Sequence, residues 1–280
     1  MVADALNRLI SWRNQPIFFG NLDDSECKIS VMSHIPVGLQ LYSLRDAAEK
    51  DILATIASVD KMGYDGIEFA GYFDHSASDI RKALNDAGLK CCGAHVPISE
   101  FADDKFEATV AFHKEIGCPY VILPWLPREW RDTHANTLET CKKLAELDEK
   151  VRSVGLQTGF HAHDADMKPL DQGFSAWNII ADNTPDTFLL QYDTCNGAVG
   201  GADPIQPILD HPGRSVSTHL KGFPVGSPVG EGEIDWAQVQ EACEGVGGVK
   251  WYIIEHETYI DCTPEEACQR GLDNWKKLTS

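Results

Sequence analysis

One stretch of the chain contains a complete strand–helix–strand unit: residues 36–69 read PVGLQLYSLRDAAEKDILATIASVDKMGYDGIEF. A short apolar run at 37–42 has the composition of a buried strand, and from about Asp51 the apolar residues recur with helical spacing. Gly63 stands where this helix should stop, because glycine commonly ends helices in the left-handed conformation. The next apolar run, 66–69, is predicted to be a second strand. A helix that connects two strands indicates that they lie parallel.

The same alternation continues to the C-terminus. The strand candidates are residues 37–42, 66–69, 90–95, 120–124, 157–163, 188–193, 215–220 and 251–255. The helices are expected to begin near residues 51, 76, 103, 134, 174, 204, 235 and 263. Ser76 and Thr263 are suitable N-cap residues, and Gly88 and Gly117 stand where helices should stop. Eight units over 36–280 predict an α/β fold with a single (β/α)8 TIM barrel, whereas five or six would indicate an open doubly wound sheet.

Residues 1–35 precede the repeating pattern and are predicted to form an N-terminal extension. One interpretation is that the natural polypeptide begins at Met32, just before the first strand. The other is that these residues form an arm that closes the bottom of the barrel or contacts a second copy in a homo-oligomer. The sequence does not choose between them.

The composition excludes several classes of partner. The formal net charge is −19, and an acidic surface repels the phosphates of nucleic acid and of anionic lipid, so neither is expected as a partner. No run of about 18 apolar residues is present, which predicts no membrane span. The 9 cysteines are odd in number and form no C-x-x-C pair, so the sequence favours a reducing cytoplasm over a disulfide framework or zinc knuckle.

Polar side chains gather at the C-terminal ends of the expected strands, where parallel barrels assemble their active sites. In chain order they are Gln40, Tyr42, Glu68, His95, Trp125, His161, His163, Asp193, His219, Lys221, Glu255 and Glu257. Residues two apart share one face of a strand, so both histidines of a pair such as His161 and His163 can point inward. Each residue alone has an ordinary explanation as a surface charge or core histidine. The set predicts a site at the top of the barrel.

A metal site is predicted from four of these residues: His161, Asp193, His219 and Glu255. They come from expected strands five to eight and offer nitrogen and oxygen donors. This set suits one divalent ion, Mn²⁺, Zn²⁺, Fe²⁺, Co²⁺ or Mg²⁺, better than a soft thiolate site does. Cys195, close to Asp193, is interpreted as a small buried thiol outside the site.

Motifs of other enzyme classes do not occur in the sequence. There is no G-x-G-x-x-G after a strand, no P-loop and no G-x-S-x-G elbow, which argues against redox cofactors and serine hydrolysis. The glycine-rich segment 222–232 follows the seventh expected strand, where barrels often bind phosphate. A flexible lid explains its glycines equally well.

The sequence resembles the xylose isomerase-like barrel superfamily, in particular its sugar phosphate isomerases/epimerases. The resemblance extends from about Pro36 to the C-terminus and depends on several short segments taken together. They are VGLQLYSLR at 37–45, GYDGIEFAG at 63–71, AHVP at 94–97, LPW at 123–125, FHAHD at 160–164, YD at 192–193, GGADP at 200–204, HLK at 219–221 and VGEGEIDW at 229–236.

This resemblance implies a single divalent metal, often Mn²⁺, held by ligands from the last four strands, with substrate hydroxyls completing its coordination. Asp193, His219 and Glu255 match the usual ligand positions. The fifth-strand position is commonly glutamate in the ketose epimerases, but here it is His161, in a segment similar to a His-Asn-His motif with Ala162 in place of the asparagine. Two metal-bound glutamates move the proton in those epimerases, and this chain lacks one of them.

Two functions follow from the resemblance. The first is a metal-dependent isomerase or epimerase that acts on a sugar or sugar phosphate by proton transfer next to a metal-bound carbonyl. The second is a lyase, hydratase or hydrolase that acts on 3-keto sugars or glycosides, to which the histidine-bearing subgroup is similar. A non-catalytic sugar-binding or metal-binding module and an abasic-site nuclease are rival classes, which the retained ligands and the acidic charge respectively disfavour.

The predicted roles within the site are these. Glu255, His161 or His163 is expected to take the proton, since a general base must lie beside the acidic carbon and histidine titrates near neutral pH. The substrate is expected to be a small carbohydrate. Its contacts are assigned to five residues, with Trp125 as an apolar face and Lys221 for an enediolate, phosphate or carboxylate: Gln40, Glu68, His95, Trp125 and Lys221.

Overall fold

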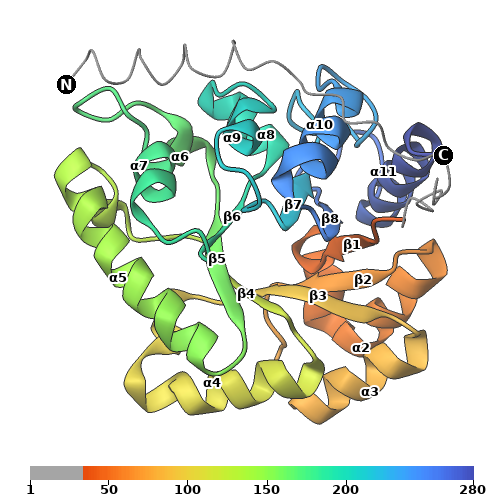
Figure 1. The fold of residues 1–280 in the computed structure, drawn as a ribbon. Helices are drawn as coiled ribbons and strands as arrows, with labels where there is room; N and C mark the ends of the chain where they lie inside the picture. Colours follow the sequence, from red (N-terminus) through yellow and green to blue (C-terminus); the bar gives the residue numbers. More distant parts are fainter. Residues whose placement is uncertain (1–33) are drawn as a thin grey trace, which may run out of the picture. The chain divides into compact units, whose positions relative to one another are not determined.

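Eight parallel strands form the centre of a computed structural model that describes residues 34–280 (Figure 1). They are β1 (Val37–Gln40), β2 (Gly66–Phe69), β3 (Lys90–His95), β4 (Tyr120–Leu123), β5 (Gln157–His161), β6 (Leu189–Gln191), β7 (Ser217–Leu220) and β8 (Trp251–Ile254). Their order in the sheet is β6-β5-β4-β3-β2-β1-β8-β7. A bridge between Asp193 and His219 joins the β6 and β7 edges, so the barrel is nearly closed. The predicted (β/α)8 barrel is confirmed.

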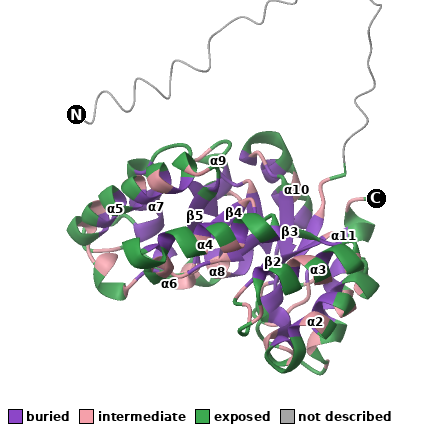
Figure 2. Ribbon diagram, turned by 90° about the horizontal axis from the view of Figure 1, so that it is seen from below, coloured by how far each residue is buried: buried purple, intermediate pink, exposed green. Residues whose placement is uncertain are grey.

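Helices follow the strands and cover the outside of the barrel. Figure 2 shows buried residues along the strands and exposed residues along the outer helix faces. The helices are α2 (Arg45–Met62), α3 (Ala77–Ala87), α4 (Asp103–Ile116), α5 (His134–Ser153), α6 (Asp164–Met167), α7 (Ala176–Asn183), α8 (Thr194–Gly200), α9 (Gln206–Leu209), α10 (Trp236–Ala242) and α11 (Pro264–Leu278), with the short segments η1 (Leu41–Leu44), η2 (Ile98–Phe101), η3 (Arg128–Trp130) and η4 (Cys243–Gly247).

Five strands end earlier than the apolar pattern predicts: β4 and β8 by one residue, and β1, β5 and β6 by two. The causes are clearest at β1 and β5. β1 ends at Gln40 rather than Tyr42 because the chain turns into η1, where the Gln40 side chain accepts the Tyr42 backbone N–H at 3.1 Å. β5 ends at His161 rather than His163, since α6 begins shortly afterwards. In both places polar residues expected on a strand lie instead in the connection that follows it.

The helix starts depend on side-chain caps that the sequence made visible. Ser76 and Thr263 each accept the backbone N–H three residues further on. α2 begins at Arg45, ahead of the expected Asp51, but Asp51 departs from helical geometry (φ −162°, ψ 91°). The Asp51 carboxylate accepts the Ala54 N–H at 2.9 Å, so it caps the second part of α2.

An apolar layer fills the barrel below the strand ends that carry the polar residues. It consists of Cys92, Tyr120, Ile122, Leu189, Trp251 and Ile253. The packing is close, because a Cβ added at Gly38 would lie 2.5 Å from Cys92 Sγ. The interior is therefore closed on one side, and polar groups can gather only toward the C-terminal ends of the strands.

Within residues 34–280, no helix combines the length and apolar character needed to cross a membrane. The predicted N-terminal extension, residues 1–35, lies outside the described residues except for its last two.

Candidate active site

Four buried side chains converge at the C-terminal ends of β5 to β8. His161 ends β5, His219 lies in β7, and Asp193 and Glu255 follow β6 and β8. Each residue offers one nitrogen or oxygen atom as a ligand, and these four atoms all lie within 4.8 Å of one another. The structure thus brings together the four residues that the sequence predicts as metal ligands.

Glu68, in β2, lies against this cluster with its carboxylate fully buried. Its Oε2 accepts a hydrogen bond from Gln40 at 2.8 Å and lies 2.6 Å from His219 Nε2, while Oε1 accepts from the Gln191 amide at 2.7 Å. Burial alone would raise the pKa of Glu68, but His95 and His219 outweigh it and hold the pKa below its usual value. Glu68 is therefore an ionised acceptor shared by several donors.

Gln191, in β6, connects two of the site histidines and is not among the site residues predicted from the sequence. Its Oε1 lies 2.8 Å from His95 Nε2 and 3.1 Å from His161 Nδ1. An amide oxygen only accepts, so both of these ring nitrogens donate. A signal was present in the sequence, since Gln191 precedes Asp193 by two residues and strand alternation gives both the same face.

The donor set fits a divalent ion. His161 gives its Nδ1 proton to Gln191, which leaves Nε2 with a free lone pair. Asp193 Oδ1 accepts the Asn196 N–H at 2.7 Å, but Oδ2 is buried without a hydrogen-bond partner. Leaving a buried acceptor unsatisfied is unfavourable, and a cation would satisfy it. His219 Nδ1 lies 3.1 Å from Glu255 Oε2, a spacing compatible with two ligands of one ion.

Lys221 and His219 supply positive charge to the same carboxylates. Lys221 Nζ pairs with Glu257 and lies 3.8 Å from Asp193 Oδ2 and 3.7 Å from Glu255 Oε2. Burial disfavours the charged form of both bases, but their carboxylate neighbours more than offset it: they raise the pKa of Lys221, and they raise the pKa of His219 to about 10. For Asp193, burial is the largest influence and raises the pKa to about 6.

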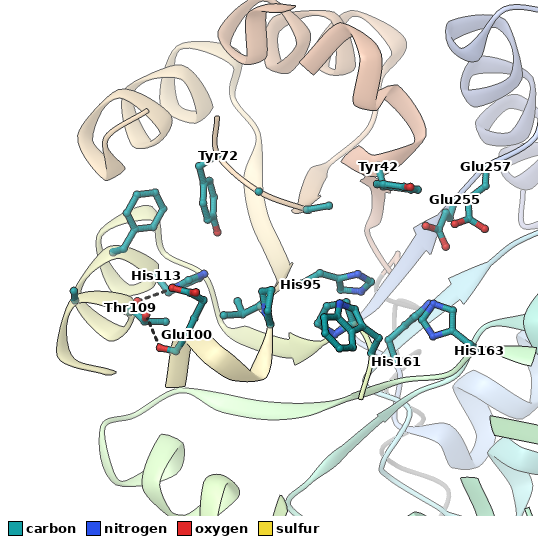
Figure 3. A pocket seen from close by; sticks show the side chains of 18 residues that line it. Tyr42, Tyr72, His95, Glu100, Thr109, His113, His161, His163, Glu255 and Glu257 are labelled. Carbon is teal, nitrogen blue, oxygen red and sulfur yellow. Dashed lines mark hydrogen bonds between the residues drawn. The ribbon is translucent and has the colours of Figure 1, made fainter. Parts of the chain in front are cut away.

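A cavity of about 820 Å³ opens beside the cluster (Figure 3). Seven residues predicted at the strand ends line it: Tyr42, His95, Trp125, His161, His163, Glu255 and Glu257. Trp125 is 50% exposed, so its ring forms part of the rim. The cavity therefore gives a small molecule access to two of the four candidate ligands, His161 and Glu255, and to His163, the remaining predicted proton carrier.

Three residues predicted as sugar contacts, Gln40, Glu68 and Lys221, are not among the residues that line the cavity. Gln40 and Glu68 are fully buried and bonded to each other, and Lys221 is only 7% exposed and paired with Glu257. A position at a strand end fixes which end of the barrel a residue occupies, but not how far its side chain reaches. Glu68 and Lys221 contact the candidate ligands instead, and Gln40 donates to Glu68.

The glycine-rich segment 222–232 packs against α11, and none of its residues lines the cavity. Asn274 donates to the Val229 carbonyl at 3.0 Å, and Arg270 pairs with Glu231 at 2.5 Å. A Cβ added at Gly230 would lie 2.5 Å from the Asn274 Cβ, so this glycine permits the close approach. Neither the phosphate-binding nor the lid interpretation gains support from this arrangement.

An eight-stranded parallel barrel with a polar cluster at its C-terminal strand ends has the architecture of a TIM-barrel protein. The model of the family described as "Xylose isomerase-like TIM barrel" matches residues 56–278. The chain belongs to this family, and the resemblance drawn from the sequence is confirmed.

Solved structures with the same fold carry different titles. A sugar phosphate isomerase/epimerase from Parabacteroides distasonis is 24% identical with a TM-score of 0.75, covering 86% of this chain and 97% of that one. An AP endonuclease, family 2, from Brucella melitensis is 16% identical with a TM-score of 0.67, covering 83% of this chain and 96% of that one. A structure titled IOLI protein with a binding zinc atom is 18% identical with a TM-score of 0.66, covering 88% of this chain and 98% of that one. Such identities show the shared fold. No curated protein sequence matches the chain.

Proposed function

We propose that the protein is a divalent-metal-dependent isomerase or epimerase that acts on a small sugar or sugar phosphate. The observation that carries this proposal is the buried cluster of His161, Asp193, His219 and Glu255 beside a cavity of about 820 Å³. Membership of the xylose isomerase-like family and likeness to a structure titled sugar phosphate isomerase/epimerase support it.

The four clustered residues would hold the ion, with Mn²⁺ as the first candidate and Zn²⁺, Co²⁺, Fe²⁺ or Mg²⁺ as alternatives. When bound, it would supply Lewis-acid polarisation of a substrate carbonyl and so make the adjacent C–H acidic. Glu68 positions His219 through the 2.6 Å contact, and Gln191 positions His161 through the bond to Nδ1. Such outer contacts fix the ring orientation and tautomer of a ligating histidine.

His163 and Glu255 are the groups proposed to move the proton, because both line the cavity. Burial lowers the pKa of His163, so its neutral imidazole can accept a proton near neutral pH. Burial alone would raise the pKa of Glu255, but Lys221 and His219 hold it below its usual value, which keeps the carboxylate ionised. One group, unprotonated, removes the proton from the carbon beside the carbonyl. The other first takes up a proton from water and delivers it to the opposite face, and the proton that was removed is then released to water. His161 is assigned to the ion.

A carbohydrate substrate is supported by the cavity wall. Trp125 offers an apolar face to a sugar ring, and His95 can hydrogen-bond to its hydroxyls. Carboxylates at Glu100, Glu255 and Glu257 also line the cavity, and with the net charge of −19 they oppose a phosphate backbone. All eight cysteines in the described part of the chain are free thiols, which supports a cytoplasmic location.

A second candidate is a lyase that acts on 3-keto glycosides, and the length of the cavity favours it. The cavity continues past His95 to Tyr72 and His113, which is more room than one sugar ring needs. The same proton would be removed first. The electron pair left on carbon would then form a double bond to the neighbouring carbon and expel its substituent, which leaves with the electrons of the broken bond.

Solvent deuterium uptake at carbon, followed by NMR, tests the proposed chemistry on a panel of ketoses, sugar phosphates and 3-keto glycosides. Uptake with formation of an epimer or isomer supports the first function, and uptake with loss of a substituent supports the second. His163→Asn or Glu255→Gln should slow exchange by about 100-fold or more. Glu107→Gln, an equivalent charge change on the exposed side of α4, is the matched control. Exchange on no member of the panel contradicts both functions.

Metal content tests the ligand assignment separately. The purified protein should contain about one ion per chain, and Asp193→Ala and His219→Ala should each lose it. Asp182→Ala, which removes an exposed carboxylate from α7, should retain it. Unchanged metal content in both ligand variants contradicts the assignment.

A further inference from the structure

The far half of the cavity lies away from the candidate ligands and has a wall of its own. Figure 3 shows Tyr72, Glu100, Thr109 and His113 on one side of His95, and His163, Glu255 and Glu257 on the other. We call the far half the outer compartment; its wall consists of Tyr72 from the loop after β2, Glu100 from η2, and Ala108, Thr109, Phe112 and His113 from α4.

Aromatic rings form much of the outer compartment. The rings of Tyr72 and Phe112 lie 4.3 Å apart between centroids at 48°, and the ring of His113 meets Tyr72 edge-on at 5.7 Å. Flat apolar surfaces at these spacings suit another ring better than a sugar, because each buried sugar hydroxyl would require its own hydrogen-bond partner.

Two polar atoms in this wall have no partner. The Tyr72 hydroxyl and His113 Nε2 are both buried and make no hydrogen bond. The hydroxyl of Tyr72 points toward the His113 ring in Figure 3. A protein rarely leaves two buried polar atoms unsatisfied side by side, because each such atom costs about 1–3 kcal/mol. The pair therefore indicates a group that is supplied from outside the chain.

The chemistry of that group follows from His113. Its Nδ1 lies 2.7 Å from the Thr109 carbonyl oxygen, which can only accept, so Nδ1 carries the ring proton. Burial lowers the pKa of His113, which keeps the ring neutral. Nε2 is then an acceptor and requires an O–H or N–H donor from the ligand, while the Tyr72 hydroxyl can donate to the same oxygen. A phenolic hydroxyl satisfies both.

We propose that the outer compartment binds an aromatic ring with a hydroxyl group, carried by a substrate whose sugar lies at the other end of the cavity. This inference rests on the proposed function for the position of the sugar. It assigns the substrate to hydroxyaryl 3-keto glycosides and related keto-sugar derivatives, which have the carbonyl that the proposed proton transfer requires. Free monosaccharides would leave much of a cavity of about 820 Å³ unfilled.

Binding of 4-methylphenol to the full-length protein tests the compartment without any sugar. Ligand-observed NMR titration should detect binding, and 4-methylanisole, which lacks the donor, should bind about threefold to tenfold more weakly. Tyr72→Phe should weaken 4-methylphenol, because it removes the hydroxyl that donates to the ligand oxygen. Ala108→Phe should fill the compartment and weaken 4-methylphenol by at least about tenfold. Ala111→Phe, the same change on an exposed position of α4 that does not line the cavity, should have no effect.

Competition tests whether the ring and the sugar belong to one ligand. 4-Hydroxyphenyl β-D-glucopyranoside should displace 4-methylphenol, whereas methyl β-D-glucopyranoside should leave it bound. The proposal is overturned if 4-methylphenol does not bind, if Ala108→Phe and Ala111→Phe bind it equally, or if the two glucosides compete to the same extent. These measurements use no turnover, so failure of deuterium exchange with normal binding of 4-methylphenol contradicts the proposed reaction and leaves the compartment intact.

Discussion

Replacing Glu68 by Gln is expected to weaken metal binding although Glu68 is not itself a candidate ligand. The Glu68 carboxylate accepts from Gln40 and Gln191 and lies 2.6 Å from His219 Nε2. A glutamine amide keeps one acceptor but turns an NH₂ group toward one of these donors. His219 also loses the negative charge that orients its ring.

The size of the effect follows from these contacts. Removing an outer partner of a ligating histidine typically lowers metal affinity by about 10- to 100-fold. In the metal-free protein, removing one member of a buried charged pair costs roughly 3–5 kcal/mol of unfolding free energy. Both changes are expected for Glu68→Gln, because burial leaves no water to replace the lost carboxylate.

Calorimetric titration of the chelator-treated protein with Mn²⁺ measures the first effect, and urea unfolding measures the second. Gln40→Leu is the matched control, since it removes one 2.8 Å hydrogen bond from Glu68 but keeps the charge beside His219. Its loss of metal affinity should be smaller than that of Glu68→Gln. If Glu68 instead bound substrate hydroxyls, as the sequence predicts, Glu68→Gln would raise KM and leave metal affinity within about twofold of the wild type. That result would refute the positioning role.

Three further predictions concern pH, packing and metal. Burial raises the pKa of Asp166 from 3.8 to about 6, although Arg131 acts in the opposite direction. The folded protein therefore keeps a proton that the unfolded chain releases, and this group's contribution to stability should fall by up to about 3 kcal/mol between about pH 4 and pH 6. The unfolding free energy of Asp166→Asn, measured in urea, should not show this fall between about pH 4 and pH 6. If the wild type and the variant lost stability equally with pH, the prediction would be contradicted. Gly38→Ala should destabilise the fold by about 1–3 kcal/mol, since its Cβ would lie 2.5 Å from Cys92 Sγ, and adding Cys92→Ala should recover part of the loss in thermal unfolding. Mn²⁺ at 100 times its Kd should add about 2.7 kcal/mol of stability that EDTA removes, with no such gain in Asp193→Ala.

The sequence predicted the candidate ligands because all strands of a parallel barrel run in the same direction. Residues at the C-terminal ends of different strands therefore lie at the same end of the barrel. His161, Asp193, His219 and Glu255 are far apart in the chain, but each follows or ends an apolar run at the same end of the barrel. Eight recurring units therefore sufficed to bring them together. The same rule does not give the direction in which a long side chain extends.

Glu68 illustrates what the pattern leaves undetermined. Its strand pairs with β3 so that Glu68 stands beside Gly93, and a Cβ at Gly93 would lie 2.6 Å from Glu68 Oε1. The missing side chain at Gly93 lets the carboxylate lie across β3 toward His219 instead of rising into the cavity. This depends on the register between two strands, which a single sequence does not specify. The outer compartment was missed for a similar reason, because a loop after β2 must bring Tyr72 against His113 on α4.

The charges of the site explain why a cation belongs there. Glu68, Asp193 and Glu255 are buried together, and Lys221 is the buried lysine that faces them among residues 34–280. Without an ion, the imbalance is met by protons: the carboxylates raise the pKa of His219 to about 10, and burial raises that of Asp193 to about 6. A histidine ligand must be neutral and a ligating aspartate ionised, so an ion and these protons compete for the same sites. The excess of buried carboxylates therefore raises the pKa of His219 for the same reason that it would favour a divalent ion. Lys221, paired with Glu257, offsets part of this negative charge but does not neutralise all three carboxylates.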